Sequence, residues 1–567
     1  MKKEFGTSRG DCFIANCWTI ARCLCLAAML VIPLISTVAD EWTQLGGSPS
    51  RNGVAKTTGL PIEWNLGAID RETWDWKGGP QAKNVLWVAK LGTQSYGSPV
   101  VTDKYVFCGT NNGNAYIKRF PKEHDLGCLL CFSRKDGQFL WQYAAPVLPD
   151  SNQNWPEQGL CSTPLVEGDR LWIVSNRGCV VCLDVEGFRD NENDGPVANE
   201  SSTQINDADV VWEYDMINQL GITPRYMTSS SVTSAGDLLF VLTSHGTNDK
   251  GQVIRPEAPS FLALNKHTGK LLWSDNSPGD RIMEGQWSSP AYAILDGVPQ
   301  VIFGGGDGWV YSFRAEETAT GRPELLWKFD ANPKNTRYQE AGMGDRNYLV
   351  AAPVVAEGRV YIVTGRDPQW GEGPADLWCI DPTKRGDVSA ELVVDSNQRP
   401  VPPRRTFAVD ETAGERVIQN PNSAVIWHYR GEDINKDGKL DFEEEFHRTI
   451  GMPAIADGLL IVGDLSGVVH CLDAVTGKAL WTYDMMASIW GSPLIADGKI
   501  YIGDEDGDVA VFALSRERQL LAENAVGSSV YTAPAAADGV LYIASQRHLI
   551  AIKEQENTTV SHYGKHN

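Results

Sequence analysis

A recurring phrase constrains this chain more than any other feature of its sequence. It consists of a small residue with Pro, an apolar stretch, a DG or EG turn, two β-rich runs and a closing TG-x-x-LW. The copy from Gly451 to Trp481 shows the phrase most fully, and related copies end at Trp141 and Trp327. Short Val/Ile/Tyr-rich runs separated by Gly/Asp turns are typical of antiparallel strands joined by tight turns. Each copy therefore predicts one small antiparallel sheet.

The tryptophan that closes the phrase shows how many sheets to expect. It occurs at Trp87, Trp141, Trp212, Trp273, Trp327, Trp427 and Trp481, and the run around Leu521 takes an eighth position without Trp. We interpret each of these runs as the outermost strand of a four-stranded sheet. The run around Trp87 lacks three preceding strands, whereas the three runs after Leu521 lack a fourth. The two incomplete ends therefore complete each other.

The predicted fold is all-β: an eight-bladed β-propeller of four-stranded antiparallel blades, closed by pairing the N-terminal strand with the last blade. Closure pairs the backbone groups that would otherwise form open sheet edges. We place the propeller at residues 85–553, an N-terminal extension at 40–84 and a C-terminal tail at 554–567. A polar, Pro-rich stretch at 383–422 predicts a surface insertion in one blade. We expect a monomer.

The N-terminus has the features of an export signal. Basic residues precede a short apolar run, Leu24 to Ile35, and small residues lead to a predicted cleavage site before Asp40. The run is short and contains Pro33, so residues 1–39 are predicted to be a signal peptide and the mature chain to have no transmembrane span. The alternative is an uncleaved anchor. We expect an exported protein, periplasmic or extracellular.

Charge narrows the choice of partners. The formal net charge is −22, and such an acidic surface repels phosphate backbones, so we expect no nucleic-acid binding. Hydrophobic residues make up 42% of the chain, which indicates a globular protein.

The full repeat, ADG-x-[VLI]-Y-[IV]-G followed by D-x-x-TG-x-x-LW, resembles the pyrroloquinoline-quinone (PQQ) type propeller repeat. GLLIVGDLSGVVHCLDAVTGKALW is a nearly clean copy, and the resemblance covers roughly residues 85–553. The opening EWTQLGGSPSRNGVA also resembles the start of exported proteins of this type. The family includes quinoprotein alcohol dehydrogenases and the outer-membrane assembly protein BamB. The resemblance implies the fold and leaves the function open, because one fold hosts both enzymes and scaffolds.

One stretch, DINKDGKLDFEE, has the pattern of an EF-hand calcium loop. Its candidate ligands, including the carbonyl of the seventh position, are Asp433, Asn435, Asp437, Lys439, Asp441 and Glu444. Gly438 occupies the position of the sharp turn. A strand-like run enters the loop, and about one turn of helix is predicted after it. We therefore predict a structural calcium clip between two blades rather than a sensor; the alternative is a turn rich in Asp and Asn.

Aligned first strands predict which residues face the central channel. The positions are Tyr96, Cys161, Ser229, Trp287, Val350, Ile450, Trp490 and Tyr531, mostly followed by small residues that suit a crowded axis. The four aromatic residues, Tyr96, Trp287, Trp490 and Tyr531, form a candidate binding site for a flat cofactor such as PQQ. The alternative is packing between blades.

A PQQ dehydrogenase would need a catalytic base, a calcium ion against the quinone and cations over the carboxylates of the ring. Adjacent cysteines, common in the alcohol dehydrogenases of the family, are missing here, and we assign no catalytic residue. Glu284 and Arg281 are the best-placed polar residues near the predicted channel mouth. A second acidic stretch, 190–201, matches only half of a calcium loop, and a solvated turn is the favoured interpretation.

Eight cysteines follow the signal segment, including Cys128/Cys131 and Cys179/Cys182 in apolar strands. Residues three apart in a strand point to opposite faces, so these pairs are predicted to be core thiols, with cross-strand disulfides left open.

Three functions are therefore carried forward. The first is an exported binding or scaffold protein of the cell envelope with protein partners and a structural calcium loop. The second is a PQQ- and calcium-dependent dehydrogenase that oxidises an alcohol or sugar. The third is a propeller that binds carbohydrate or another polymer.

Overall fold

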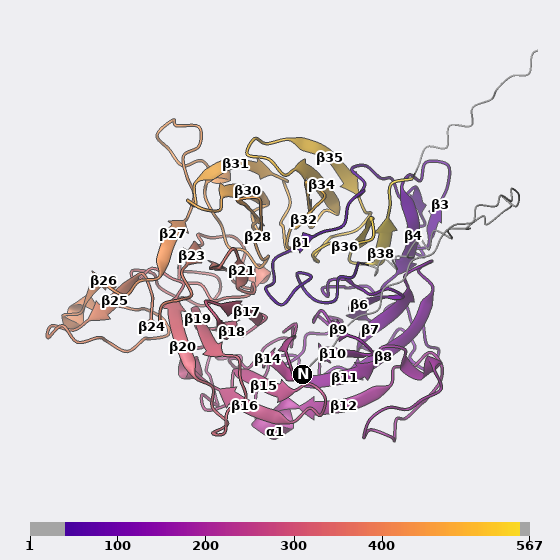
Figure 1. Cartoon of the computed structure of the whole chain (residues 1–567), viewed down its shortest axis with the longest axis horizontal. Coiled ribbons are helices and arrows are strands. Elements are labelled where there is room, and N and C mark those ends of the chain that lie inside the picture. The colour runs from indigo at the N-terminus through magenta and orange to yellow at the C-terminus, as the bar shows by residue number, and fades with distance from the viewer. Residues whose placement is uncertain (1–39, 556–567) are drawn as a thin grey trace, which may run out of the picture. The chain divides into compact units, whose positions relative to one another are not determined.

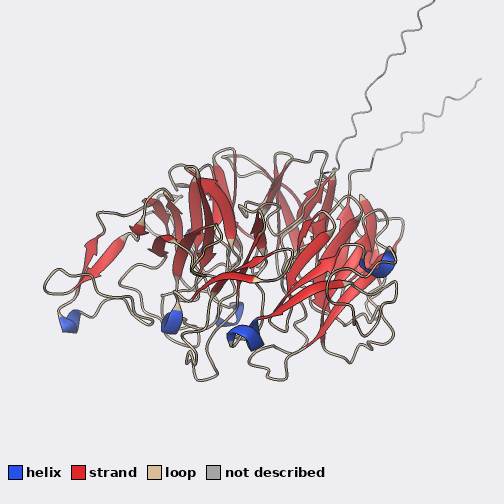
Figure 2. Cartoon of the chain, turned by 60° about the horizontal axis from the view of Figure 1, so that its bottom comes forward, coloured by secondary structure: helices blue, strands red, loops and turns tan. Residues whose placement is uncertain are grey.

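The computed structural model describes residues 40–555, and their secondary structure is almost entirely β (Figure 1). Eight four-stranded antiparallel sheets form the blades of a propeller, which confirms the predicted fold class. Figure 2 shows how little of the described chain is helical. The predicted signal peptide, 1–39, and residues 556–567 of the predicted tail lie outside the described residues.

Blades 1 to 4 each use four strands that are consecutive in the chain. From the inner to the outer strand they are β5 (Val100–Val101), β6 (Tyr105–Asn111), β7 (Leu126–Ser133) and β8 (Phe139–Pro146); β9 (Leu165–Glu167), β10 (Arg170–Val174), β11 (Cys179–Asp184) and β12 (Val210–Asp215); β13 (Thr233–Ala235), β14 (Leu238–Leu242), β15 (Phe261–Asn265) and β16 (Leu271–Asp275); β17 (Ala291–Leu295), β18 (Val298–Gly304), β19 (Trp309–Arg314) and β20 (Leu325–Asp330).

Blades 5 to 8 include one blade with an insertion and one that joins the two ends of the propeller. Their strands are β21 (Val354–Ala356), β22 (Arg359–Val363), β23 (Leu377–Ile380) and β27 (Val425–Tyr429); β28 (Ala454–Ala456), β29 (Leu459–Gly463), β30 (Val468–Asp473) and β31 (Ala479–Asp484); β32 (Leu494–Ala496), β33 (Lys499–Gly503), β34 (Asp508–Ala513) and β35 (Leu520–Ala525); β36 (Ala535–Ala537), β37 (Val540–Ala544), β38 (His548–Ile552) and β4 (Val85–Lys90).

The last blade closes the ring as predicted. Strand β4 pairs antiparallel with β38, with Trp87 opposite Ala551 and Ala89 opposite Leu549. The seven closing tryptophans all lie on outermost strands, and Leu521 lies on β35. The N-terminal strand therefore completes the last blade and closes the ring between the last blade and the first.

The TG-x-x-LW signature joins neighbouring blades. Trp427 of blade 5 packs on Gly477 of blade 6, where an added Cβ would lie 2.5 Å from the indole ring. The indole Nε1 of Trp427 donates a hydrogen bond to the carbonyl of Ala474 at 3.1 Å. Trp87 uses Gly137 and the carbonyl of Arg134 of blade 1 in the same way. The repeat therefore encodes the blade-to-blade contact as well as the strands.

A segment of the N-terminal extension, residues 42–57, contacts all eight blades in order, and we name it the collar. It includes strand β1 (Val54–Ala55), which pairs in parallel with β32 near the middle of Figure 1. The contacts from blade 1 to blade 8 are Trp42–Val101, Thr43–Val166, Gln44–Thr233, Pro49–Tyr292, Ser50–Val355, Asn52–Ile455, Val54–Ile495 and Thr57–Gly539. The collar thus ties the inner strands of the ring together.

Arg51 of the collar is fully buried, with no exposed surface. Its guanidinium donates to four backbone carbonyls, those of Leu45, Ser231, Val232 and Pro290, over distances of 2.6–3.1 Å. Burial lowers its pKa to about 9, so it remains a cation at neutral pH. Arg51 therefore fastens the collar to blades 3 and 4.

The remaining elements decorate the ring. The predicted insertion separates β23 from β27, and its β24 (Gly386–Asp387) pairs in parallel with the outer strand of blade 4. The other elements are β2 (Ala68–Ile69), β3 (Trp76–Gly78), α1 (Met216–Leu220), β25 (Glu391–Val394), β26 (Arg416–Gln419) and the 3-10 turns Gly187–Arg189, Gly279–Arg281, Pro368–Trp370, Glu411–Ala413 and Phe442–Glu444. Strands β25 and β26 form the hairpin at the left of Figure 1.

The cores between blades hold the cysteines. All eight cysteines among the described residues are buried and free, so no cross-strand disulfide forms there. Cys128 and Cys131 belong to different hydrophobic clusters, as do Cys179 and Cys182, which agrees with opposite faces of one strand. In residues 40–555 no helix is both long enough and apolar enough to cross a membrane.

Candidate functional site

A cavity of about 630 Å³ lies on the inner side of the ring. All eight positions predicted to face the channel line it. Leu45 of the collar also lines it, so the N-terminal extension contributes to its wall. The prediction of what faces the axis therefore holds for every blade.

Three of the four candidate aromatic residues form a cluster. Tyr96, Trp490 and Tyr531 come from blades 1, 7 and 8, which are neighbours in the closed ring. Their ring centroids lie 5.3 Å apart for Tyr96–Tyr531, 4.6 Å for Trp490–Tyr531 and 6.2 Å for Tyr96–Trp490. Burial raises the pKa of Tyr96, so its phenol stays neutral. We name these three residues the aromatic cluster.

Trp287, the fourth candidate, lies apart from the aromatic cluster. It stacks on Tyr226 with centroids 6.2 Å apart and an interplanar angle of 9°. Its Nε1 donates to the carbonyl of Arg225, and only 7% of the residue is exposed. The four aromatic residues thus all line the cavity but do not make one continuous ring; Trp287 also packs between blades, as the alternative interpretation expected.

Three carboxylates that the sequence analysis did not single out also line the cavity: Asp367, Glu372 and Glu505. They lie in loops between the second and third strands of blades 5 and 7. Glu505 accepts a hydrogen bond from Nε1 of Trp490 at 3.4 Å, which places it beside the aromatic cluster. Within residues 40–555 no Lys, Arg or His side chain lies within 4.0 Å of these three carboxylates. The wall therefore carries negative charge without a cationic partner.

Asp367 is the most buried of the three carboxylates. It is 8% exposed, and one of its oxygens accepts a hydrogen bond from the amide of Gln369. Burial raises its pKa to about 6, with Glu284 acting in the same direction and Arg225 against it. The order of the strands in the sequence indicates where these residues lie. In an antiparallel blade, the loop after the second strand lies at the same end as the start of the first strand.

Two buried arginines hold the loop that carries Asp367 and Glu372. Arg448 donates to the carbonyls of Trp370 and Glu372, and both Arg448 and Arg366 donate to the side-chain oxygen of Asn347. Both arginines are 1% exposed, and burial lowers the pKa of Arg448 to about 10. They fix the backbone of the loop and leave its carboxylates facing the cavity.

The small residues near the axis form a belt of hydrogen bonds. The amide of Ala533 donates to Ser98 Oγ, that of Ser98 to Thr163 Oγ1, that of Thr163 to Ser231 Oγ and that of Ser231 to Ser289 Oγ. Each step passes from one blade to the next. Small size was the expected reason for these residues, but their hydroxyl groups also link five blades.

The polar pair nearest the predicted mouth has other roles. Glu284 is buried and accepts hydrogen bonds from Tyr348 and Trp370, both at 2.8 Å. Arg281 forms an ion pair with Asp307 at 3.2 Å. Neither residue lines the cavity, so both support the fold around it.

The cavity wall does not match what PQQ would require. The carboxylates of PQQ need cations over the ring, and the lining residues within the described chain include no Lys, Arg or His. The guanidinium of Arg225 stacks over Tyr226, 4.0 Å from the ring centroid, and is not part of the wall. The cations that PQQ would need are therefore missing from the described wall, although its carboxylates could serve as a base or as calcium ligands.

The predicted calcium loop connects β27 of blade 5 with β28 of blade 6. A strand enters it and a 3-10 turn, Phe442–Glu444, follows, as expected. Asp433 accepts hydrogen bonds from the amides of Asp437 and Gly438, and Glu444 accepts them from Ile434 and Asn435. No group of three or more His, Cys, Asp and Glu residues placed to hold a metal occurs in residues 40–555.

Other candidate ligands of the loop form hydrogen bonds within the loop. Asn435 accepts a hydrogen bond from the amide of Asp437 and donates one to Asp441. Lys439 donates its amide to the side chain of Asp437. The donor set of two carbonyl-type and four carboxylate groups suits calcium, whereas the ion itself stays a prediction.

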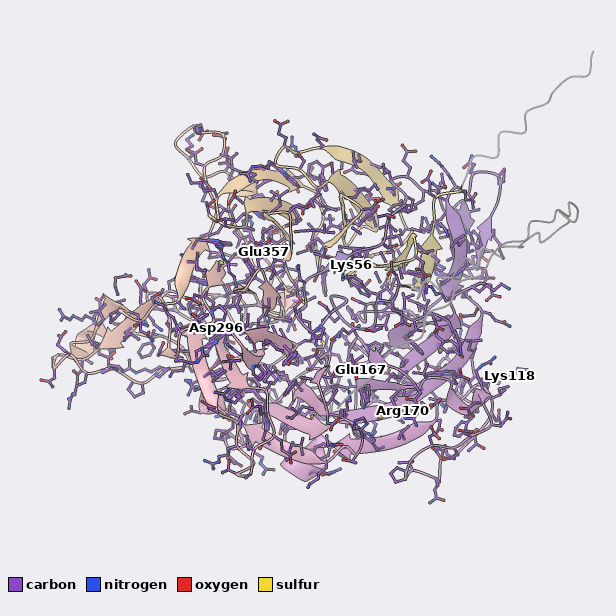
Figure 3. All side chains as sticks on the ribbon, viewed as in Figure 1. Lys56, Lys118, Glu167, Arg170, Asp296 and Glu357 are labelled. Atoms are coloured by element: carbon purple, nitrogen blue, oxygen red, sulfur yellow. The ribbon has the colours of Figure 1, made fainter. Side chains whose placement is uncertain are left out.

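The second acidic stretch has a different partner. Asp194 pairs with Arg170, which Figure 3 labels, at 2.6 Å, and Arg170 also pairs with Asp184 at 2.6 Å. Asp190 and Glu192 are exposed. The guanidinium of Arg170 therefore occupies the carboxylate of Asp194, which a metal ion would need as a ligand. This favours a solvated turn over a metal site for the stretch 190–201.

Comparison with known families agrees with the fold and the repeat. A family model described as outer membrane protein assembly factor BamB matches residues 202–429 and 408–520, together more than half of the chain. The chain belongs to this family. The expected family resemblance is therefore confirmed for this BamB-family chain. None of the curated proteins matches it.

Three solved structures illustrate what this BamB-family chain is similar to in fold. BamB from Moraxella catarrhalis is 13% identical with a TM-score of 0.45, covering 83% of this chain and 96% of its own. Quinohemoprotein alcohol dehydrogenase from Comamonas testosteroni is 12% identical with a TM-score of 0.54, covering 90% and 80%. Quinohemoprotein alcohol dehydrogenase ADHIIG from Pseudomonas putida HK5 is 12% identical with a TM-score of 0.52, covering 91% and 80%. At these identities the likeness concerns the fold.

Proposed function

We propose that this protein is an exported binding or scaffold protein of the cell envelope, and that its central cavity receives a group presented by its ligand or partner. Membership of a family named for outer membrane protein assembly supports a role in the envelope. The observation that carries the proposal is the charge of the cavity wall, which has three carboxylates and, among described lining residues, no cation. The alternative, a PQQ dehydrogenase, would require cations over the carboxylates of its cofactor.

Site-specific photo-crosslinking tests the proposal. A photo-crosslinking amino acid at Glu372 lies at the cavity, whereas the same group at Glu357 lies in the turn between β21 and β22 of the same blade. We expect one defined envelope protein or ligand to be captured from position 372 and not from position 357. Equal capture from both positions would contradict a role for the cavity.

Titration with PQQ and calcium tests the dehydrogenase alternative directly. A quinone stacked in the cavity would quench tryptophan fluorescence, and the quenching would be lost in Trp287→Ala because Trp287 lines the cavity. We expect no saturable quenching and no dye reduction with alcohols or sugars. Saturable quenching that depends on Trp287 would overturn the proposed function in favour of the enzyme.

The proposal includes a structural calcium ion in the loop 433–444. Its support is the order of the oxygen donors and the position of the loop between two blades. Asp433, Asn435, Asp437, Asp441 and Glu444, with the carbonyl of Lys439, would hold the ion. Calcium there would stabilise the connection, since the loop closes with a bridge between Gly431 and Glu445.

A further inference from the structure

The aromatic cluster and the carboxylate beside it have the composition of a cation site. The ring centroids of two tyrosines and a tryptophan lie within 6.2 Å of one another, all three residues line the cavity, and aromatic faces attract cations. Glu505 lies at their edge, hydrogen-bonded to Trp490. Uncharged aromatic packing alone would not require a carboxylate at this place.

The carboxylates of the cavity have no ion-pair partner among the described residues. Asp367 is more than nine-tenths buried, and the only hydrogen-bond donor to its carboxylate among the described residues is the amide of Gln369. Glu372 lies on the same loop, and Glu505 faces the cavity from blade 7. Buried charges in proteins are usually paired, so the buried carboxylate of Asp367, which has no ion-pair partner, indicates a partner that arrives from outside. Glu505 is half-buried and Glu372 is exposed, and both add negative charge at the same cavity.

We infer that the central cavity binds an organic cation, an ammonium or guanidinium group, between the aromatic cluster and the carboxylates of Glu505, Asp367 and Glu372. This inference rests on the proposed binding function and names the chemistry of its ligand. The cation can come from a free amine or from a Lys or Arg side chain of a partner protein. The volume of about 630 Å³ accommodates either source.

The roles of the residues differ. Tyr96, Trp490 and Tyr531 supply π faces, Glu505 supplies the charge next to them, and Asp367 and Glu372 supply charge from blade 5. Aromatic rings desolvate the cation and select a delocalised or methylated head group, whereas the carboxylates select the sign of its charge. The hydroxyl belt contributes polar surface through Ser98, Thr163 and Ser231.

Calorimetric titration at low ionic strength tests the inference, because charge attraction is least screened there. The probes are tetramethylammonium, N-acetyl-argininamide and, as a control of opposite charge, N-acetyl-glutamate. We expect saturable binding of at least one cation and none of the anion. Glu505→Gln and Tyr531→Leu should each weaken cation binding about tenfold, a loss in the range of one desolvated cation–π or ionic contact.

Glu357→Gln is the matched control, since Glu357, labelled in Figure 3, is exposed in a turn of blade 5 and does not line the cavity. It should bind cations as the unmodified protein does. A peptide with one central Arg that binds about tenfold more tightly than N-acetyl-argininamide would indicate a protein source, and equal or weaker binding a free amine.

Two results would overturn the inference: no saturable binding of any cationic probe, or unchanged affinity in a folded Glu505→Gln variant. If cations fail while crosslinking from position 372 succeeds, the cation site is wrong and the binding function stands. If PQQ binds, both fail together.

Discussion

Asp367 shows how the cavity acts on a single residue. Its carboxyl has a pKa of about 6 instead of 3.8 because it is buried beside Glu284, with only partial relief from Arg225. A raised carboxyl pKa means that the folded state prefers the protonated form. The stability that this preference provides is fully present below pH 4 and is lost as the pH rises through about 6.

Asp367→Asn should therefore stabilise the protein at pH 8 and have little effect near pH 3.8. The expected gain at pH 8 is roughly 2–3 kcal/mol, since the pKa shift is about two units and the Asn side chain can still accept the hydrogen bond from Gln369. Urea unfolding of both proteins at the two pH values measures this difference. A gap that is equal at both pH values would contradict the assignment.

At the scale of elements, the blades are joined by the tryptophan of one blade and the turn glycine of the next. Gly477 has φ of +74° and lies against Trp427, so a side chain there meets both backbone strain and the ring. Gly498, in the turn between β32 and β33, has φ of +67° and nothing within 4 Å of an added Cβ. A comparison of Gly477 with Gly498 therefore separates the cost of backbone strain from the cost of the clash with Trp427.

We expect Gly498→Ala to cost about 1 kcal/mol, the strain of a left-handed backbone, and Gly477→Ala about 3 kcal/mol, because overpacking against Trp427 adds to that strain. Denaturant unfolding compares the two variants. Equal losses would mean that the contact between blades 5 and 6 adjusts around the new methyl group.

The loop 433–444 should stabilise the protein only when calcium is bound. Calcium at about a hundred times its dissociation constant should add about 2.7 kcal/mol to the free energy of unfolding and raise Tm by about 2–3 °C over a sample with chelator. Glu444→Gln should abolish the increase, because Glu444 is the twelfth and bidentate ligand position. Glu443→Gln, an exposed neighbour at a non-ligand position, should retain it. Identical melting with calcium and with chelator in the unmodified protein would remove the clip from the proposal.

At the scale of the whole molecule, the repeat was sufficient to predict the ring, because each blade is local in sequence and ends on a tryptophan. Closure followed from Trp87 and the three strands after Leu521. The axis-facing positions followed from aligning first strands, and all eight line the cavity.

What the sequence could not supply are contacts between distant irregular segments. Asp367, Glu372 and Glu505 lie in loops of unequal length, so repeat alignment gives them no common position. The collar touches each blade through only a few contacts, many of them through backbone atoms, which leave no side-chain pattern. The hydroxyl belt was visible as a run of small residues, but size and hydrogen bonding could not be separated without the geometry.

The collar leads to the broadest prediction. Arg51→Met removes the donors to the carbonyls of Ser231, Val232 and Pro290 and leaves those buried groups without partners. We expect this to weaken attachment of the collar by about 2–3 kcal/mol. The amides of Val166, Tyr292 and Val355 donate to collar carbonyls, so they should exchange their hydrogens about 30–100-fold faster in the variant. Lys56→Met changes an exposed collar residue, labelled in Figure 3, and should leave these rates unchanged. Faster exchange spread evenly over the inner and outer strands would mean that Arg51 stabilises the whole ring. Faster exchange confined to these amides would mean that the collar detaches from the propeller while the blades stay folded.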